Sequence, residues 1–294
     1  MANLITEDPK KLVLASFSQT IAKTHIKNLR NFNIDDAYDN AIQTIFGYEG
    51  LQKYLEYGGL QNRSPAEVII SLVPYSSIWD NAKLYLDINN ISIPKNKDIV
   101  HTLIKQLIKI NINSLADNIG ALCPQTELWP PLYPNVNMFL SHLSNKQVDF
   151  GIISSGHEVF IRKVFEYYGM DQPLFCVTPD DKFELYGMDW KSKTKPSTYL
   201  IASAMQKWIA SWSDDFKQRV QESGQDCMEY ACHNAVYIGD DLKLDGYMAN
   251  NAGIPFLLFY PDDSVQIHFE GEHRKFSLYS QLIDALDTGI LFKL

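Results

Sequence analysis

The stretch that decides the fold is YIGDDLKLDGYMANNAGI, residues 237–254. An apolar run at residues 235–238 leads into it and has the character of a buried strand, and acidic residues follow at Asp240, Asp241 and Asp245. A helical pattern comes next and stops at Gly253, a residue type that commonly ends helices. Strand, acidic turn and helix in this order predict a loop at the carboxyl end of a parallel strand, where open α/β sheets bind their ligands.

Three more short apolar runs have the character of buried parallel strands, at residues 12–14, 150–153 and 255–260. The first two are followed by small or polar residues and then by a helical pattern. Strand-then-helix repetition predicts a Rossmann-like, doubly wound parallel sheet of the α/β class. Residues 277–286 carry apolar residues at helical spacing, so we expect a terminal helix there that packs on the sheet.

Between the first two strands lies a long stretch, about residues 23–130, with helical patterns and no convincing strand. Helices are expected at residues 35–46 and 98–110. Consecutive prolines at the end of the stretch break regular structure and mark the return to the main domain. We therefore expect a core domain made of residues 1–22 and 131–294, with an all-helical cap domain, residues 23–130, inserted into it.

Composition places the chain among ordinary globular proteins, because 46% of its 294 residues are hydrophobic. A net charge of -9 and the lack of a basic stripe argue against nucleic acid as a partner. The opening residues are too polar for a secretory signal, and no apolar run approaches the roughly 18 to 20 residues of a membrane span. We therefore expect no membrane partner and a cytoplasmic location, where the scattered cysteines stay reduced.

The strand at residues 150–153 ends in hydroxyl groups. Ser154 and Ser155 follow it directly, and Gly156 leads into an expected helix. Free backbone N–H groups at the start of a helix favour an anion, so these residues are candidates for anion binding. His157 is expected on the surface of the first helical turn.

A lysine-rich loop comes later in the chain. Lys195 precedes Pro196, and proline is favoured at the first position of a helix, so a helix is expected to begin there. Lys191 and Lys193 lie close by, and the sequence leaves open which of the three lysines faces a site. A solvated basic loop is the simpler interpretation, and only the order of the other motifs outweighs it.

In their order and spacing, these segments resemble the motifs of the haloacid dehalogenase (HAD) superfamily. The resemblance covers about residues 10–22 and 132–262, and the helical insertion resembles in placement the family's cap domain. The family's first motif is Asp-x-Asp-x-Thr after an apolar run, and here the sequence is SFSQT, residues 16–20. Ser16 therefore replaces the nucleophile and Ser18 replaces the general acid/base.

The resemblance implies a site for a phosphate or another anion beside a magnesium site. The implied anion ligands are Ser16, Ser18, Thr20, Ser154, Ser155, Gly156 and Lys195, and the implied metal ligands are Asp240, Asp241 and Asp245. Because the two first-motif carboxylates are missing, we expect magnesium binding to be weak or absent, and we expect no other cofactor. A helix-capping aspartate is the alternative interpretation of the acidic turn.

The departure in the first motif also changes the expected chemistry. A serine hydroxyl is a poor nucleophile unless a base accepts its proton, and Ser18 is no base. Our first hypothesis is therefore a HAD-like protein without the usual phosphatase activity, which binds an anionic or phosphorylated small molecule or a protein partner. The alternative is an active phosphatase-type hydrolase with a non-standard nucleophile, such as Ser16 with His25 as its base. A third hypothesis is an interaction module that binds a protein through the cap.

Overall fold

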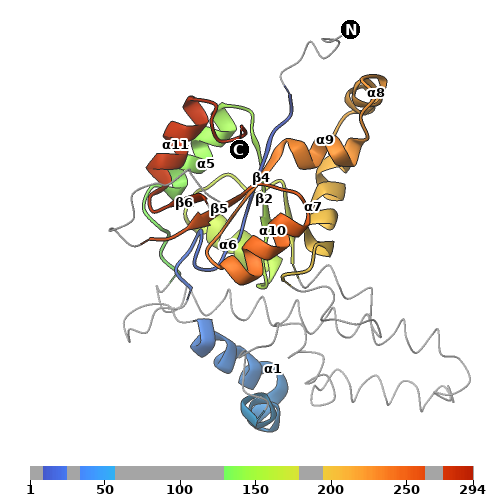
Figure 1. Cartoon of the computed structure of the whole chain (residues 1–294). Coiled ribbons are helices and arrows are strands. Elements are labelled where there is room, and N and C mark those ends of the chain that lie inside the picture. The colour runs from blue at the N-terminus through green and yellow to red at the C-terminus, as the bar shows by residue number, and fades with distance from the viewer. Residues whose placement is uncertain (1–8, 25–33, 57–128, 179–194, 262–273, 294) are drawn as a thin grey trace, which may run out of the picture.

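The computed structural model describes residues 9–24, 34–56, 129–178, 195–261 and 274–293. Within these ranges, six parallel strands form one central sheet in the order β3-β2-β1-β4-β5-β6, with helices on both faces (Figure 1). The strands are β1 (Leu12–Ala15), β2 (Asp149–Ile153), β3 (Phe175–Val177), β4 (Ala235–Gly239), β5 (Phe256–Phe259) and β6 (Arg274–Phe276). The expected Rossmann-like parallel sheet is confirmed.

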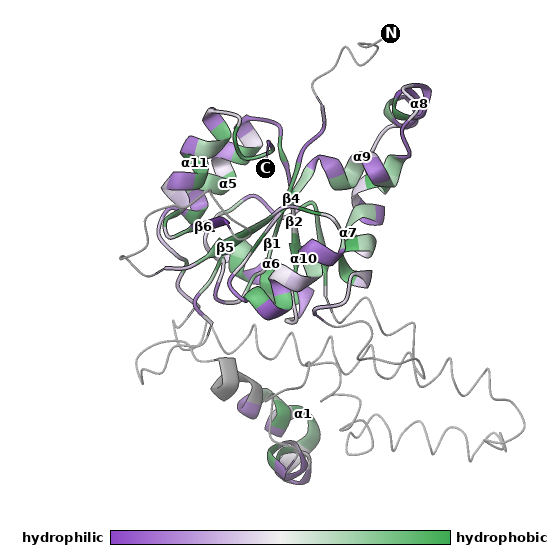
Figure 2. Cartoon of the chain, in the orientation of Figure 1, coloured by the Kyte–Doolittle hydropathy of each residue, from purple (hydrophilic) through white to green (hydrophobic). Residues whose placement is uncertain are grey.

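Alternation along β1 divides the core into two layers. Val13 and Ala15 belong to one hydrophobic cluster, whereas Leu12 and Leu14 belong to the other, and all four are fully buried. The first cluster includes residues of α5 (Val136–Asn145), α6 (Glu158–Tyr167) and α11 (Tyr279–Asp287). The second includes residues of α7 (Tyr199–Ala210), α8 (Asp214–Glu222), α9 (Cys227–His233) and α10 (Tyr247–Asn251). Burial of each such aliphatic side chain contributes about 1.5–3 kcal/mol, and Figure 2 shows the central strands as the hydrophobic middle of the molecule.

The sequence predicted four of the six strands and the terminal helix, with boundaries close to those observed. It missed β3 and β6, because a strand of three residues is too short to show a periodicity. The helix expected at residues 35–46 belongs to α1 (Ile34–Glu56), whose backbone is interrupted at Gly47, where φ is 69°. The helix expected at residues 98–110 lies outside the described residues.

The chain leaves the core after β1 and returns before α5 along two adjacent segments. Ala22 forms an antiparallel bridge with Leu132, and the N–H of Lys23 donates to the carbonyl of Pro131 at 2.8 Å. The two ends of the intervening stretch therefore lie side by side, as an insertion requires. The domain boundaries stay a prediction, because residues 57–128 lie outside the described part of the chain.

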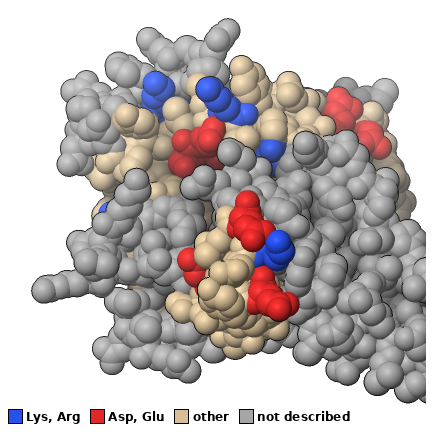
Figure 3. Space-filling model, turned by 90° about the horizontal axis from the view of Figure 1, so that it is seen from below, with Lys and Arg blue, Asp and Glu red and all other residues tan. Residues whose placement is uncertain are grey.

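No helix in the described part of the chain is long and apolar enough to cross a bilayer. The cysteines there, Cys176, Cys227 and Cys232, are free thiols. On the face seen in Figure 3, the described lysine and arginine side chains are interspersed with acidic ones and form no continuous basic patch.

Candidate functional site

The candidate site lies where three neighbouring strands end. β1 pairs with β2 on one side and with β4 on the other, and Ala15 is in register with Ile152 and Ile238. The residues that follow these strand ends, among them Ser16 and Ser154, therefore emerge at the same edge of the sheet. This edge is also the point where the chain changes direction across the sheet, which is where open α/β sheets form ligand crevices.

A pocket of about 290 Å³ lies at this edge. Its lining residues are Ser16, Ser18, Gln19, Ser154, Ser155, Lys195, Asp240, Asp241, Leu244 and Asp245. The structure thus brings together most of the residues that the sequence motifs singled out. Thr20 and Gly156 are not part of this lining, because both make internal contacts described below.

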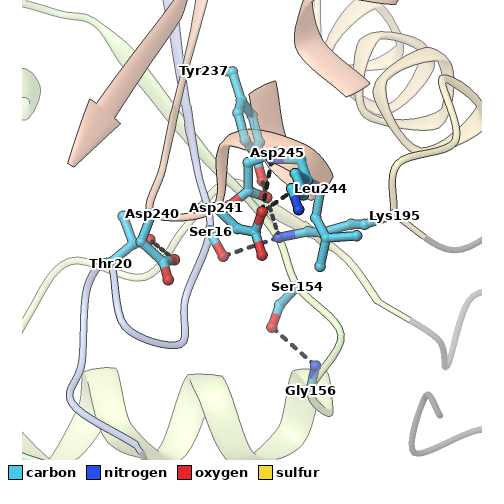
Figure 4. Close-up of polar contacts among 11 residues, drawn as sticks. Ser16, Thr20, Ser154, Gly156, Lys195, Tyr237, Asp240, Asp241, Leu244 and Asp245 are labelled. Carbon is cyan, nitrogen blue, oxygen red and sulfur yellow. Dashed lines mark hydrogen bonds and ion pairs between the residues drawn. The ribbon is translucent and has the colours of Figure 1, made fainter. Parts of the chain in front are cut away.

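Lys195 reaches from its loop into the middle of the site (Figure 4). Its Nζ lies 2.7 Å from Oδ1 of Asp245 and donates to Oγ of Ser16 at 3.0 Å. The side chains of Lys195 and Asp245 are only 8% and 3% exposed. Lys195 thus lines the pocket, and the other two candidate lysines, Lys191 and Lys193, lie outside the described residues.

The expectation that Pro196 begins a helix is wrong. The chain first makes a turn at Lys195 and Pro196, and α7 begins only at Tyr199, after the N-cap residue Thr198.

Asp245 is fixed from several directions. The hydroxyl of Tyr237 donates to Oδ1 at 2.9 Å, and the N–H of Asp241 donates to Oδ2 at 3.3 Å. Gly239 leaves space for this carboxylate, because a Cβ there would lie 2.6 Å from the Cβ of Asp245. Asp245 sits in a single π-helical turn, Leu242–Gly246, and a turn of this kind is frequent at functional sites.

Tyr237 is a site residue that the sequence reading missed. Burial raises its pKa well above the usual value, and the charge of Asp245 raises it further, so the phenol keeps its proton at neutral pH. Its hydroxyl is bound to Asp245, so Tyr237 supports the same carboxylate that pairs with Lys195. The only signal in the sequence is a tyrosine within the otherwise aliphatic strand β4.

Asp241 has a structural task. Its Oδ1 accepts hydrogen bonds from the N–H groups of Lys243 and Leu244, at 2.8 and 3.0 Å. It is therefore the N-cap of the π-helical turn, and the capping alternative is confirmed for this aspartate. A carboxylate oxygen that accepts two backbone N–H groups is a poor candidate for a metal ligand.

Asp240 lies on the opposite side of Ser16 from Lys195 in the view of Figure 4. The buried hydroxyl of Thr20 donates to its Oδ1 at 2.7 Å, and the hydroxyl of Tyr279 donates to the carbonyl of Thr20 at 3.0 Å. Burial raises the pKa of Asp240, and the hydrogen bond from Thr20 acts in the opposite direction. Thr20 therefore positions this acid and does not itself line the pocket.

The segment between β2 and α6 differs from the sequence-based expectation at one residue. Oγ of Ser154 accepts a hydrogen bond from the N–H of Gly156 at 3.0 Å, which uses one of the free donors before α6. His157 was expected on the surface, but it is only 1% exposed. His157 is the N-cap of α6 and has an extended backbone, with φ -90° and ψ 136°. Its side chain therefore does not point outward as one in the first helical turn would.

Gln19 takes a left-handed backbone conformation, with φ 57°. Glycine adopts this conformation with little strain, whereas other residue types adopt it rarely. Here Oε1 of Gln19 accepts a hydrogen bond from the N–H of Thr24 at 3.0 Å. The loop after β1 is thus held by a side chain instead of by glycine.

No protein-family model matches this chain, and no curated protein matches it either. Similar solved structures exist at low sequence identity. One is a 2-haloacid dehalogenase from Pseudomonas syringae, 16% identical, with a TM-score of 0.41 and coverage of 95% of this chain and 99% of that chain. Another is the putative HAD-hydrolase YfnB from Bacillus subtilis bound to magnesium, 13% identical, with a TM-score of 0.45 and coverage of 95% and 99%.

A third is CbbY from Rhodobacter sphaeroides in complex with phosphate, 12% identical, with a TM-score of 0.47 and coverage of 93% of this chain and 96% of that chain. The fold itself rests on the parallel sheet and on the motif segments that meet at its carboxyl edge. Within the described residues, the chain has a Rossmann-like α/β fold, with a parallel sheet at whose carboxyl edge the motif segments meet.

Proposed function

We propose that this chain is a HAD-like protein without aspartate-based phosphoryl transfer, whose pocket binds a small phosphorylated or otherwise anionic molecule. The observation that carries the proposal is the chemistry at the end of β1. Ser16 and Ser18 line the pocket where the family's motif has carboxylates, and the hydroxyl of Ser16 accepts a hydrogen bond from Lys195. Without a carboxylate at either position, the acyl-phosphate intermediate of the family has no group on which to form.

The environment of Ser16 weighs against the hydrolase alternative. Its hydroxyl accepts a hydrogen bond from the ammonium group of Lys195, and the nearby phenol of Tyr237 donates to Asp245. Because burial raises the pKa of Tyr237, the phenol holds its own proton and is no base for the serine. His25, the other suggested base, lies outside the described residues.

The pocket offers hydrogen-bond donors suited to an oxyanion. The hydroxyls of Ser16, Ser18 and Ser154 can each donate, and Lys195 supplies a positive charge. The carboxylates of Asp241 and Asp245 are already engaged by backbone N–H groups and by the lysine, which limits their repulsion of an anion. Binding by mostly neutral donors should be modest in affinity and sensitive to the charge of Asp240.

Magnesium does not fit the described residues as they are arranged. Asp241 caps a helical turn, Asp245 is paired with Lys195, and Asp240 accepts a hydrogen bond from Thr20. Among the described residues, no group of three or more Asp, Glu, His or Cys side chains is placed to hold a metal ion. Our proposed function therefore includes no step that uses a metal.

Two measurements on the purified full-length chain test the proposal. Inorganic phosphate and a series of sugar phosphates should raise the midpoint of thermal unfolding in a concentration-dependent way, whereas the matching unphosphorylated sugars should not. An aryl phosphate with magnesium should give no turnover. Turnover of about 1 per second or faster would overturn the proposal, and Ser16→Ala would then show whether Ser16 or another group is the nucleophile.

The remaining expectations concern partners and location. A protein partner that binds through residues 23–130 stays a hypothesis, because most of that stretch lies outside the described residues. A cytoplasmic location also stays a prediction, which cell fractionation tests. Absence of nucleic-acid binding is expected from the net charge of -9.

A further inference from the structure

The acids of the site have separate partners, and one of them is held by a cation of the protein itself. Lys195 places Nζ 2.7 Å from Oδ1 of Asp245 and 3.0 Å from Oγ of Ser16. The pair is almost completely buried, with exposed fractions of 8% and 3%. The positive charge that such a group of oxygens requires is therefore already present within the fold.

We propose that the ammonium group of Lys195 is the resident cation of this site and occupies the place that a divalent metal ion would need, so that the pocket works without metal. This inference concerns the site before any ligand binds, so it does not depend on the proposed function.

The positive charge of Lys195 opposes a metal ion at Asp245. Magnesium binds carboxylate oxygens at about 2.0–2.1 Å, and an ion at Oδ1 of Asp245 would therefore lie beside the ammonium group that contacts the same oxygen. Like charges so close together repel strongly where water is largely excluded. The ion and the lysine exclude each other from Asp245.

Hydrogen bonds also fix the orientation of the Asp245 carboxylate. Tyr237 donates to Oδ1 and the N–H of Asp241 donates to Oδ2, so hydrogen bonds already use lone pairs of both oxygens. Asp245 also packs closely against Gly239, where an added Cβ would lie 2.6 Å from the Cβ of Asp245. A metal ion would have to displace donors that are part of the fold.

Position 16 also lacks a carboxylate that could bind a metal ion. Position 16 carries a neutral hydroxyl that accepts a hydrogen bond from the lysine. A neutral hydroxyl attracts a metal ion much more weakly than a charged carboxylate does, and magnesium sites usually contain one or two carboxylates. Lys195 contacts both Ser16 and Asp245 at hydrogen-bond distances.

The test is a titration of the full-length chain with Mn²⁺, whose free-ion electron paramagnetic resonance signal is lost on binding, followed by competition with Mg²⁺. The variants are Lys195→Met and Lys195→Gln. The matched control is Lys146→Met, which removes a lysine 2.9 Å from Asp287 on the surface. Circular dichroism verifies the fold of each protein.

We expect the wild type and the control to show no saturable site below about 1 mM Mn²⁺. Both Lys195 variants should bind Mn²⁺ at least about tenfold more tightly, because the competing charge is gone. If Lys195→Met does not fold, Lys195→Gln decides, since its amide still donates hydrogen bonds.

Three results would overturn the inference. One is a saturable site in the wild type from which Mg²⁺ displaces Mn²⁺. Another is folded Lys195 variants with unchanged affinity. The third is an equal gain in Lys146→Met, which would reduce the effect to a change in net charge. If neither Lys195 variant folds, the wild-type titration decides alone: a saturable site overturns the inference and its absence supports it.

Discussion

Two lysine–carboxylate pairs lie at opposite ends of the sheet, and their distances are nearly the same. Lys195 and Asp245 are 2.7 Å apart at the carboxyl end, and Lys146 and Asp287 are 2.9 Å apart beside the loop that enters β2. Exposure separates them, because the first side chains are 8% and 3% exposed and the second are both 47% exposed. The surroundings of an ion pair, and not the distance alone, therefore decide how much the pair contributes to stability.

The largest expected effect comes from removing the acid of each pair. Asp245→Ala leaves Lys195 and the hydroxyl of Tyr237 buried without this partner, so the free energy of unfolding should fall by about 3–5 kcal/mol. Asp287→Ala should lower the midpoint of thermal unfolding by no more than about 3 °C. Chemical and thermal denaturation of both variants measure this. Equal losses would remove the distinction between the two pairs.

A methyl group at Gly239 sharpens the comparison without removing a charge. In Gly239→Ala the new Cβ would meet Asp245, so the buried pair must shift, at a cost of about 1–3 kcal/mol. Gly156→Ala is the matched control, because its Cβ would come no closer than 3.4 Å to Oγ of Ser154. Urea denaturation should show a clear loss for the first variant and a smaller one for the second. Similar losses would mean that Asp245 moves freely.

Restoring the missing acids should turn the carboxyl end of the sheet into a metal site. Ser16→Asp with Ser18→Asp puts a new carboxylate near Lys195, which then has a second partner and holds Asp245 less firmly. Without metal, repulsion from Asp240 should lower the thermal midpoint modestly. Magnesium should raise the midpoint of the double variant and leave the wild type nearly unchanged. An equal shift in both proteins would contradict the inference that serines at positions 16 and 18 weaken magnesium binding.

The smallest expected effect is a pH dependence of anion binding. Burial raises the pKa of Asp240 above its usual value, so this acid takes up its proton earlier than usual as the pH falls. Loss of its charge should tighten sulfate binding a few-fold toward acid pH, and Asp240→Asn should make the profile flat. Sulfate is preferred, because phosphate itself changes charge near pH ~6. Calorimetric titration at several pH values measures the profile, and wild-type affinity that is independent of pH would contradict the assignment.

The same shift has a defined sign for stability. An acid whose pKa is raised by folding contributes stability below its unfolded value, and this contribution is lost as the pH rises through the folded value. Asp240 therefore opposes folding at neutral pH, where it is charged, and Thr20 offsets part of that cost through its hydrogen bond.

The fold was largely predictable because apolar runs identify buried strands. Residues 12–14 and 235–238 contain little besides aliphatic side chains, and both form central strands of the sheet. The short edge strand β6 was not predictable, since its sequence is RKF and only Phe276 is buried. Motif order also predicted that Ser16 and Ser154 would meet at one edge, because parallel strands place their carboxyl ends together.

The roles of single side chains were harder to predict. Asp240, Asp241 and Asp245 stand close together in the sequence, yet one binds Thr20, one caps a turn and one pairs with Lys195. The partner of Asp240 is 220 residues away, and Lys195 reaches Ser16 across 179 residues. No local pattern encodes such pairs.

The sequence by itself determined the parallel sheet, the edge where the candidate site lies and the presence of hydroxyl groups at Ser16 and Ser18. Those properties depend on residue type and local order, which are written in the chain. Only the tertiary structure decided that Lys195 holds both Asp245 and Ser16, that Asp241 serves as a cap and that Tyr237 donates to Asp245. The physical reason is that burial and hydrogen-bond partners depend on which segments pack together, and packing joins residues that are distant in the sequence.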